Sequence, residues 1–144
     1  MWLSRRKSSL RLRGFSPRPA RNLSTEPLEH AYYSAYHAAN ELEKSFPARS
    51  AYVRANVGDH ESLFLLLEHP NAGLDYELRI ISLDIGAQLR MLRPFRKLAT
   101  YEIANDVTIT DVEEAMAAAK DIVAECGKGK RKVAVHRAAP PAAA

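Results

Sequence analysis

The apolar side chains of residues 28–46 recur at spacings of three and four, and this regularity limits the possible folds more than any other feature of the sequence. The stripe consists of Leu28, Tyr32, Ala35, Ala39, Leu42 and Phe46. That spacing stacks side chains along one face of an α-helix. Pro47 lacks a backbone N–H and disfavours helical dihedrals at Phe46, so we expect the helix to end there. Residues 36–54 therefore predict an antiparallel helical hairpin, with a second helix beginning near Ser50.

The strongest apolar pattern lies between residues 72 and 93. Its main stripe consists of Leu74, Leu78, Ile81, Ile85, Leu89 and Leu92, and it is widened by Ile80, Leu83, Ala87 and Met91. Such a broad apolar surface predicts the most buried helix of the protein, with Leu78, Ile81, Ile85 and Leu89 as its most buried residues. We expect Pro94 to end this helix.

Two further helices complete the predicted fold. The second helix is expected to run from residue 50 to residue 68, with a kink or a restart at Asp59, because Gly58 weakens its middle. Thr110 and Glu113 have the spacing of a capping box, which predicts a fourth helix to about residue 125 that Gly127 ends. The fold class is all-α: an antiparallel three-helix bundle of residues 27–45, 50–68 and 72–93, an additional C-terminal helix near 111–125, and extended basic termini.

The charge is divided unevenly along the chain. Residues 1–25 hold seven Lys/Arg and no acid, residues 27–126 hold nine Lys/Arg against sixteen Asp/Glu, and the segment from Gly127 onward adds five basic residues. The net charge of +4 therefore does not describe one basic surface. We divide the chain into a basic N-terminal extension (1–25), one helical domain (26–126) and a basic, Ala/Pro-rich tail (127–144).

The N-terminal extension has the composition of a mitochondrial transit peptide. It is rich in Arg and Ser, lacks acidic residues before Glu26, and places Leu and Phe among the cations. A basic arm that binds an acidic partner is the alternative. The single cysteine, Cys126, fits a reducing compartment. No apolar run reaches the roughly 20 residues that cross a bilayer, so we expect no direct membrane span.

No catalytic, cofactor-binding or metal-binding residues are predicted. His60-Glu61 and Glu68-His69 lack the compact spacing of a helical zinc site. Gly127-Lys128-Gly129-Lys130 is not a phosphate loop, because no Ser or Thr follows the lysine. The tyrosines near residues 32–52 suit either a core with hydroxyls at its edge or a protein interface. The candidate interface residues are Tyr33, Tyr36, Tyr52, Arg54, Arg93 and Phe95.

Residues 27–95 resemble a known family. Tyr36-His37-Ala38-Ala39-Asn40-Glu41-Leu42-Glu43-Lys44-Ser45-Phe46-Pro47, followed by Tyr52 and Arg54, is similar to the helical hairpin of the alpha-subcomplex subunit 5 family of mitochondrial complex I, the NADH:ubiquinone oxidoreductase of the respiratory chain. Three further stretches continue the similarity: Glu68-His69-Pro70-Asn71, Gly73-Leu74-Asp75-Tyr76-Glu77-Leu78 and Arg93-Pro94-Phe95. The fourth helix and the basic tail have no counterpart in that family.

The resemblance implies a non-catalytic accessory subunit without a cofactor of its own. Such a subunit is peripheral to the matrix side of the mitochondrial inner membrane, and its partners are core and accessory protein subunits of the complex. One alternative is a structural protein of the mitoribosome, in which the basic ends would contact nucleic acid. Another is an accessory subunit of cytochrome c oxidase, because Leu98-Ala99-Thr100-Tyr101-Glu102 resembles its helical subunit 5A.

Overall fold

The structure is a computed structural model that describes residues 18–101 and 108–138. The described residues form α1 (Arg18–Ser45), α2 (Asp59–Glu68), α3 (Tyr76–Tyr101) and α4 (Ile109–Ala138). None of these residues belongs to a β-strand. The predicted all-α class is therefore confirmed.

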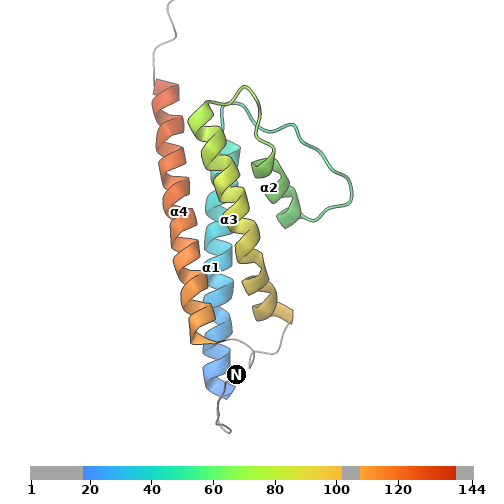
Figure 1. The fold of residues 1–144 in the computed structure, drawn as a ribbon, viewed down its shortest axis with the longest axis vertical. Coiled ribbons are helices and arrows are strands. Elements are labelled where there is room, and N and C mark those ends of the chain that lie inside the picture. Colours follow the sequence, from blue (N-terminus) through green and yellow to red (C-terminus); the bar gives the residue numbers. More distant parts are fainter. Residues whose placement is uncertain (1–17, 102–107, 139–144) are drawn as a thin grey trace, which may run out of the picture.

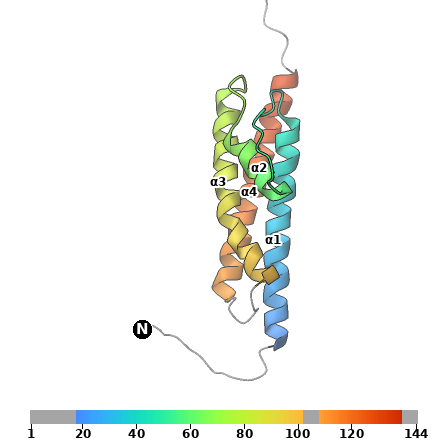
Figure 2. The same cartoon turned by 90° about the vertical axis from the view of Figure 1, so that its right-hand side faces the viewer.

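The three long helices pack side by side along the length of the molecule. α1 and α4 run in the same direction, and α3 runs antiparallel to both (Figure 1). The short helix α2 lies over the seam between α1 and α3 (Figure 2). The bundle therefore consists of α1, α3 and α4, whereas the sequence predicted that the second helix, and not the fourth, completes it.

One hydrophobic core runs through the bundle. Leu78, Ile85 and Leu89 of α3 are fully buried and Ile81 is nearly so, as the sequence predicts. α4 contributes Ala115, Ala119, Ile122, Cys126 and Val133 to the same core. Most of these α4 residues are small, and small residues allow close approach between helices. A Cβ atom added at Gly129 would lie 2.9 Å from a methyl carbon of Leu42, so α1 and α4 come together at this glycine.

The second helix begins nine residues later than predicted, at Asp59 and not at Ser50. Residues 46–58 form a loop, so the helical hairpin predicted for residues 36–54 is absent. This loop carries no apolar stripe that a helix could bury, and its side chains from 51 to 56 are exposed. Gly58 is the N-cap residue of α2, and Asp59 and Glu61 add negative charge to the first turn, which the helix dipole favours. The restart expected at Asp59 is thus the true beginning of the helix.

Two helices continue beyond the residues expected to end them. Pro94 lies inside α3, which reaches Tyr101. The turn around it is held from both sides, because Arg93 pairs with Glu61 and Phe95 packs against the core. α4 passes through Gly127, whose φ is not positive, and ends at Ala138. Burial of Gly129 and Val133 explains why the helix extends into the segment predicted to be an extended tail.

The helix starts also differ from the predicted ones in detail. α1 begins at Arg18, so Pro27 lies inside it and not in its first turn. The capping box of α4 is two residues earlier than expected: the Asp111 N–H donates to Thr108 Oγ1, and the Thr108 N–H donates to Asp111 Oδ2, each at 3.0 Å. Asp75 caps α3 by accepting the Glu77 N–H at 3.0 Å. The predicted break at His69-Pro70-Asn71 is confirmed, since α2 ends at Glu68.

The residues expected to widen the buried surface of α3 are exposed. Ile80, Leu83 and Met91 have exposed fractions of 47%, 43% and 75%, and Ala87 is also exposed. α3 contacts α1, α4 and α2, and these three neighbours leave its outer face uncovered. The prediction that this helix is buried over its whole apolar surface is therefore wrong.

Candidate protein interface

A cluster of aromatic and histidine rings joins α1 to the beginning of α2. Tyr32 is fully buried, and its hydroxyl lies 2.6 Å from His60 Nδ1. Tyr36 packs on the same imidazole with ring centroids 4.5 Å apart. The ring of Tyr33 meets His60 edge-on, and its hydroxyl accepts a hydrogen bond from Arg96 Nη2 at 3.0 Å. Two of the candidate interface residues therefore hold α2 against α1.

Burial and nearby cations set the protonation of this cluster. Desolvation lowers the pKa of His60, and the positive charges of Arg96 and Arg93 lower it further, while Asp59 opposes them. Burial raises the pKa of Tyr32 to about 12, and it raises the pKa of Tyr36 together with the charge of Asp59. The neutral imidazole can accept the Tyr32 hydroxyl proton in a hydrogen bond, so the folded protein favours uncharged His60.

We predict that stability falls as the pH drops below the ordinary histidine pKa of about 6.5. Because the pKa of His60 is lower in the folded state, the unfolded chain takes up this proton first, and mild acid favours unfolding. Urea denaturation of the wild type and His60→Gln between neutral and mildly acidic pH measures the effect. The variant is expected to lose part of the pH dependence, and His30→Gln, at an exposed position, is expected to keep it. Identical slopes for all three proteins would contradict the prediction.

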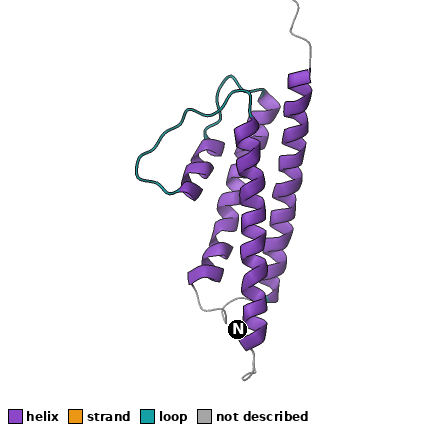
Figure 3. Cartoon of the chain, turned by 180° about the vertical axis from the view of Figure 1, so that it is seen from behind, coloured by secondary structure: helices purple, strands orange, loops and turns teal. Residues whose placement is uncertain are grey.

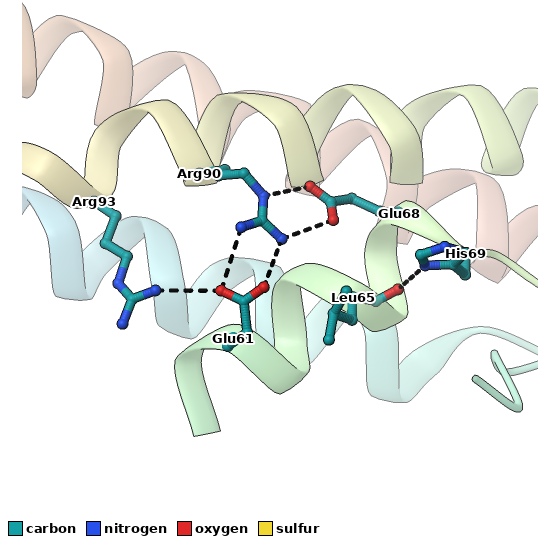
Figure 4. Close-up of polar contacts among 6 residues, drawn as sticks. All are labelled: Glu61, Leu65, Glu68, His69, Arg90 and Arg93. Carbon is teal, nitrogen blue, oxygen red and sulfur yellow. Dashed lines mark hydrogen bonds and ion pairs between the residues drawn. The ribbon is translucent and has the colours of Figure 1, made fainter. Parts of the chain in front are cut away.

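A network of ion pairs fixes α2 to α3 (Figure 4). Arg90 donates from Nε and Nη2 to Glu68 at 2.7 and 2.8 Å, and from Nη1 and Nη2 to Glu61 at 3.2 and 3.0 Å. Arg93 Nη1 reaches Glu61 at 3.3 Å. Both guanidinium groups also lie over the ring of Phe64. The hydrogen bonds from Arg90 lower the pKa of Glu61.

α2 and α3 pack closely, and a side chain of α3 donates a hydrogen bond to a backbone carbonyl at the end of α2. Ser82 is buried and donates from Oγ to the Leu67 carbonyl at 2.8 Å. That carbonyl belongs to the last turn of α2, where no intrahelical donor is available. A Cβ atom on Gly86 would lie 3.1 Å from Leu67 Cβ. The glycine therefore allows the two helices to approach at this level.

The loop of residues 46–58 extends from the bundle on the side of α2 (Figure 3). Contacts at its base hold it in place: Arg49 pairs with Glu43, Ser50 Oγ donates to the His69 carbonyl, and Asn71 Nδ2 donates to the Arg49 carbonyl at 3.0 Å. Tyr52 stacks on His69 with ring centroids 3.9 Å apart. Beyond these contacts Val53 is 87% exposed. The loop is thus held at its base and exposes the apolar side chain of Val53 to solvent.

The structure separates the six candidate interface residues into two groups. Tyr33, Tyr36, Arg93 and Phe95 are half-buried and make contacts within the protein. Tyr52 and Arg54 belong to the loop and are exposed. Sequence reasoning missed the roles of His60, Glu61, Glu68 and Arg90. The seven-residue interval between Glu61 and Glu68 was the available signal, since it places both carboxylates on one helix face.

The described residues were also compared with the requirements of a metal site, a reactive thiol and a membrane span. No three His, Cys, Asp or Glu side chains in this part of the chain are arranged to hold a metal ion. Cys126 is buried, and burial raises the pKa of its thiol to about 12, so little thiolate is present at neutral pH. Over residues 18–101 and 108–138, no helix has the length and apolar character needed to span a bilayer.

Comparisons with known proteins give no match: no family model fits the chain, and neither curated proteins nor solved structures show a significant similarity.

Proposed function

We propose that this chain is a non-catalytic accessory subunit of the matrix-side arm of mitochondrial complex I. Two lines of argument support the proposal. The first is the resemblance of residues 27–95 to the alpha-subcomplex subunit 5 family, together with a basic, acid-free N-terminal segment of the transit-peptide kind. The second is the surface around α2, which suits protein binding.

The observation that carries the proposal is the anchored loop of residues 46–58. Val53 is almost fully exposed, and Tyr52 is held beside it by stacking on His69. Arg54 adds a cation to the same exposed stretch. Tyrosine and arginine are enriched at interface centres, and a loop held in one conformation loses less entropy on binding. We infer that this loop inserts between partner subunits while the ring cluster and Arg90 hold α2 behind it.

The proposed role predicts that loop substitutions release the chain from its assembly. Tyr52→Ser with Val53→Ser removes apolar contact without changing the core, so retention is expected to fall strongly, whereas Val135→Ser on α4, also at an exposed position, is expected to have no effect. The measurement is native sizing of solubilised mitochondria, with detection of the tagged chain and of NADH dehydrogenase activity. Electron transfer per assembled complex should stay unchanged. A chain absent from mitochondria, or present there at monomer size only, would refute the proposal.

One observation favours the mitoribosome as the second candidate. The last turns of α4 carry Lys128, Lys130, Arg131, Lys132 and Arg137 on a continuous helix. Lys128 and Lys132 pair with Glu125 and Glu77, while Lys130 and Arg131 have no acidic partner among the described residues. Phosphate contacts make binding strongly salt-dependent. A chain that migrates with rRNA at low salt and is released from it at moderate salt would favour this candidate over complex I.

A further inference from the structure

The outer face of α3 carries an uncovered apolar stripe. It consists of Tyr76, Ile80, Leu83, Ala87 and Met91, all of them exposed. Tyr76 and Met91 are the most exposed, at 66% and 75%. In Figure 2 this helix forms one edge of the molecule, with α2 and the other long helices on its remaining sides. Ile80 and Leu83, in the middle of the stripe, are 47% and 43% exposed. The stripe is made of residues other than those of the loop 46–58.

From Tyr76 to Ala87 the spacing of this stripe is that of a coiled-coil seam, with intervals of four, three and four residues. Met91 lies one residue beyond the next seam position and therefore at the edge of the stripe. Apolar residues at alternating intervals of three and four form the seam through which two helices pair. The stripe is about 23 Å long at 1.5 Å per residue. Pairing over so short a length is expected to be weak and reversible.

The charges beside the stripe distinguish between possible partners. Arg79 lies on one flank, while Glu77 and Asp84 lie on the other. Arg79 uses Nε to reach the Leu74 carbonyl at 3.0 Å, and its guanidinium lies 5.6 Å from the centroid of the Tyr76 ring. Its terminal nitrogens donate to no acceptor among the described residues. Asp84 is exposed and accepts only from Gln88 among the described residues. Glu77 is already paired with Lys132 of α4 at 2.6 Å, so Arg79 on one flank and Asp84 on the other are the two charges that face a possible partner.

A second copy of the same helix matches these flanks in only one direction. When two identical helices pair in parallel about a twofold axis along the seam, the flank that carries Arg79 in each copy meets the flank that carries Asp84 in the other. In an antiparallel pair, like flanks meet. Arg79 and Asp84 are five residues apart, which is the interval between the g position of one helix and the facing e position of its parallel partner. The dimer thus has two such pairs, each formed by Arg79 of one copy and Asp84 of the other.

We propose that the exposed face of α3 binds the same face of a second copy of this chain, in parallel, with Arg79 of each copy paired to Asp84 of the other. Ile80, Leu83 and Ala87 form the seam between these two ion pairs. This surface differs from the loop of residues 46–58, so self-association is independent of the role proposed above. Failure of one leaves the other intact.

Sedimentation equilibrium of the full chain from micromolar to millimolar concentration tests the association. The wild type is expected to show a concentration-dependent dimer, and Leu83→Glu is expected to remain monomeric. Val135→Glu serves as the matched control, because it adds the same charge at another exposed apolar position, on α4. A wild type that is monomeric throughout, or a dimer unaffected by Leu83→Glu, would overturn the proposal.

Charge reversal tests the partner and the direction. Arg79→Asp and Asp84→Arg should each weaken the dimer roughly tenfold, because two attractive pairs become repulsive. An equimolar mixture of the two variants should dimerise again, since each Arg then faces an Asp. Ala87→Cys should cross-link to itself under mild oxidation, as the two seam positions face each other only in the parallel arrangement. Buried Cys126 does not compete for this disulfide. No recovery in the mixture, or no cross-link in a dimeric sample, would refute the parallel pair.

Discussion

Replacing Ile81 with alanine is expected to lower the free energy of unfolding by about 2–5 kcal/mol, the range for large-to-small substitutions in a core. Ile81 is 6% exposed and belongs to the stripe of α3 that faces the bundle. A Cβ atom on Gly129 would come within 3.4 Å of its Cγ2 atom, so the side chain fills the space where α3 meets α4. A domain of this size has little stability to spare.

Ile80 provides the matched control, because it has the same side chain at the neighbouring position and faces away from the core. It is 47% exposed, so Ile80→Ala is expected to change the free energy of unfolding by less than about 1 kcal/mol. Urea denaturation at low micromolar protein, where self-association is negligible, measures both variants. Equal losses of unfolding free energy for the two variants would mean that Ile81 does not face the core.

Gly129→Ala is expected to destabilise the protein relative to Gly127→Ala by about 1–3 kcal/mol, the usual cost of overpacking a core. Both glycines lie inside α4, so each substitution gains about 1 kcal/mol of helix propensity. At Gly127 a Cβ atom would meet only Arg131, at 3.5 Å. At Gly129 it would lie 2.9 and 3.0 Å from the two terminal methyl carbons of Leu42, which is fully buried, and 3.4 Å from Ile81 Cγ2.

The comparison of these two variants isolates the packing of α1 against α4. Gly127→Ala should unfold at higher urea concentration than the wild type, and Gly129→Ala at lower. A stabilised Gly129→Ala protein would show that α4 can move away from α1 at no cost. A destabilised Gly127→Ala protein would contradict the continuous helix in that region.

The all-α class and the buried face of α3 were predictable from the sequence because both rest on local periodicity. Spacings of three and four residues identify a helix and its apolar side without reference to other elements. The same signal cannot tell which of two apolar faces is covered. Such a pattern does not distinguish Ile80 from Ile81. The positions of α1, α2 and α4 decide that Ile80 is exposed and Ile81 is buried.

Helix ends were predicted less well because tertiary contacts overrode the local signals. Pro94 and Gly127 are common helix terminators, yet burial of Phe95, Gly129 and Val133 around them keeps both helices intact. The region from Ser50 to Gly58 shows the reverse case. It has no strong helix breaker before Gly58, but it has no apolar face to bury either, and it remains a loop.

The candidate interface was predictable in composition but not in arrangement. A cluster of tyrosines near the first helix indicated a core edge or a binding surface, and the structure shows the packing at the core edge for Tyr33 and Tyr36. Tyr33 and Tyr36 pack internally because both rings contact His60 of α2, which lies more than 20 residues away in the sequence, where no local pattern reports it. Whether Tyr52 and Arg54 bind a partner stays a prediction for the sizing experiment.

The parallel arrangement of α1 and α4 affects how fast the chain can fold. These two helices share the most extensive contact in the bundle, yet all of α2 and α3 lies between them in the sequence. Closing so long a segment costs conformational entropy before the contact between the helices can form and stabilise the chain. Folding slows as the mean sequence separation of contacts grows. During synthesis the part of the apolar face of α1 that packs against α4 stays uncovered until α4 has left the ribosome. Burial of that apolar surface, and with it protection against aggregation, is therefore complete only when α4 has packed.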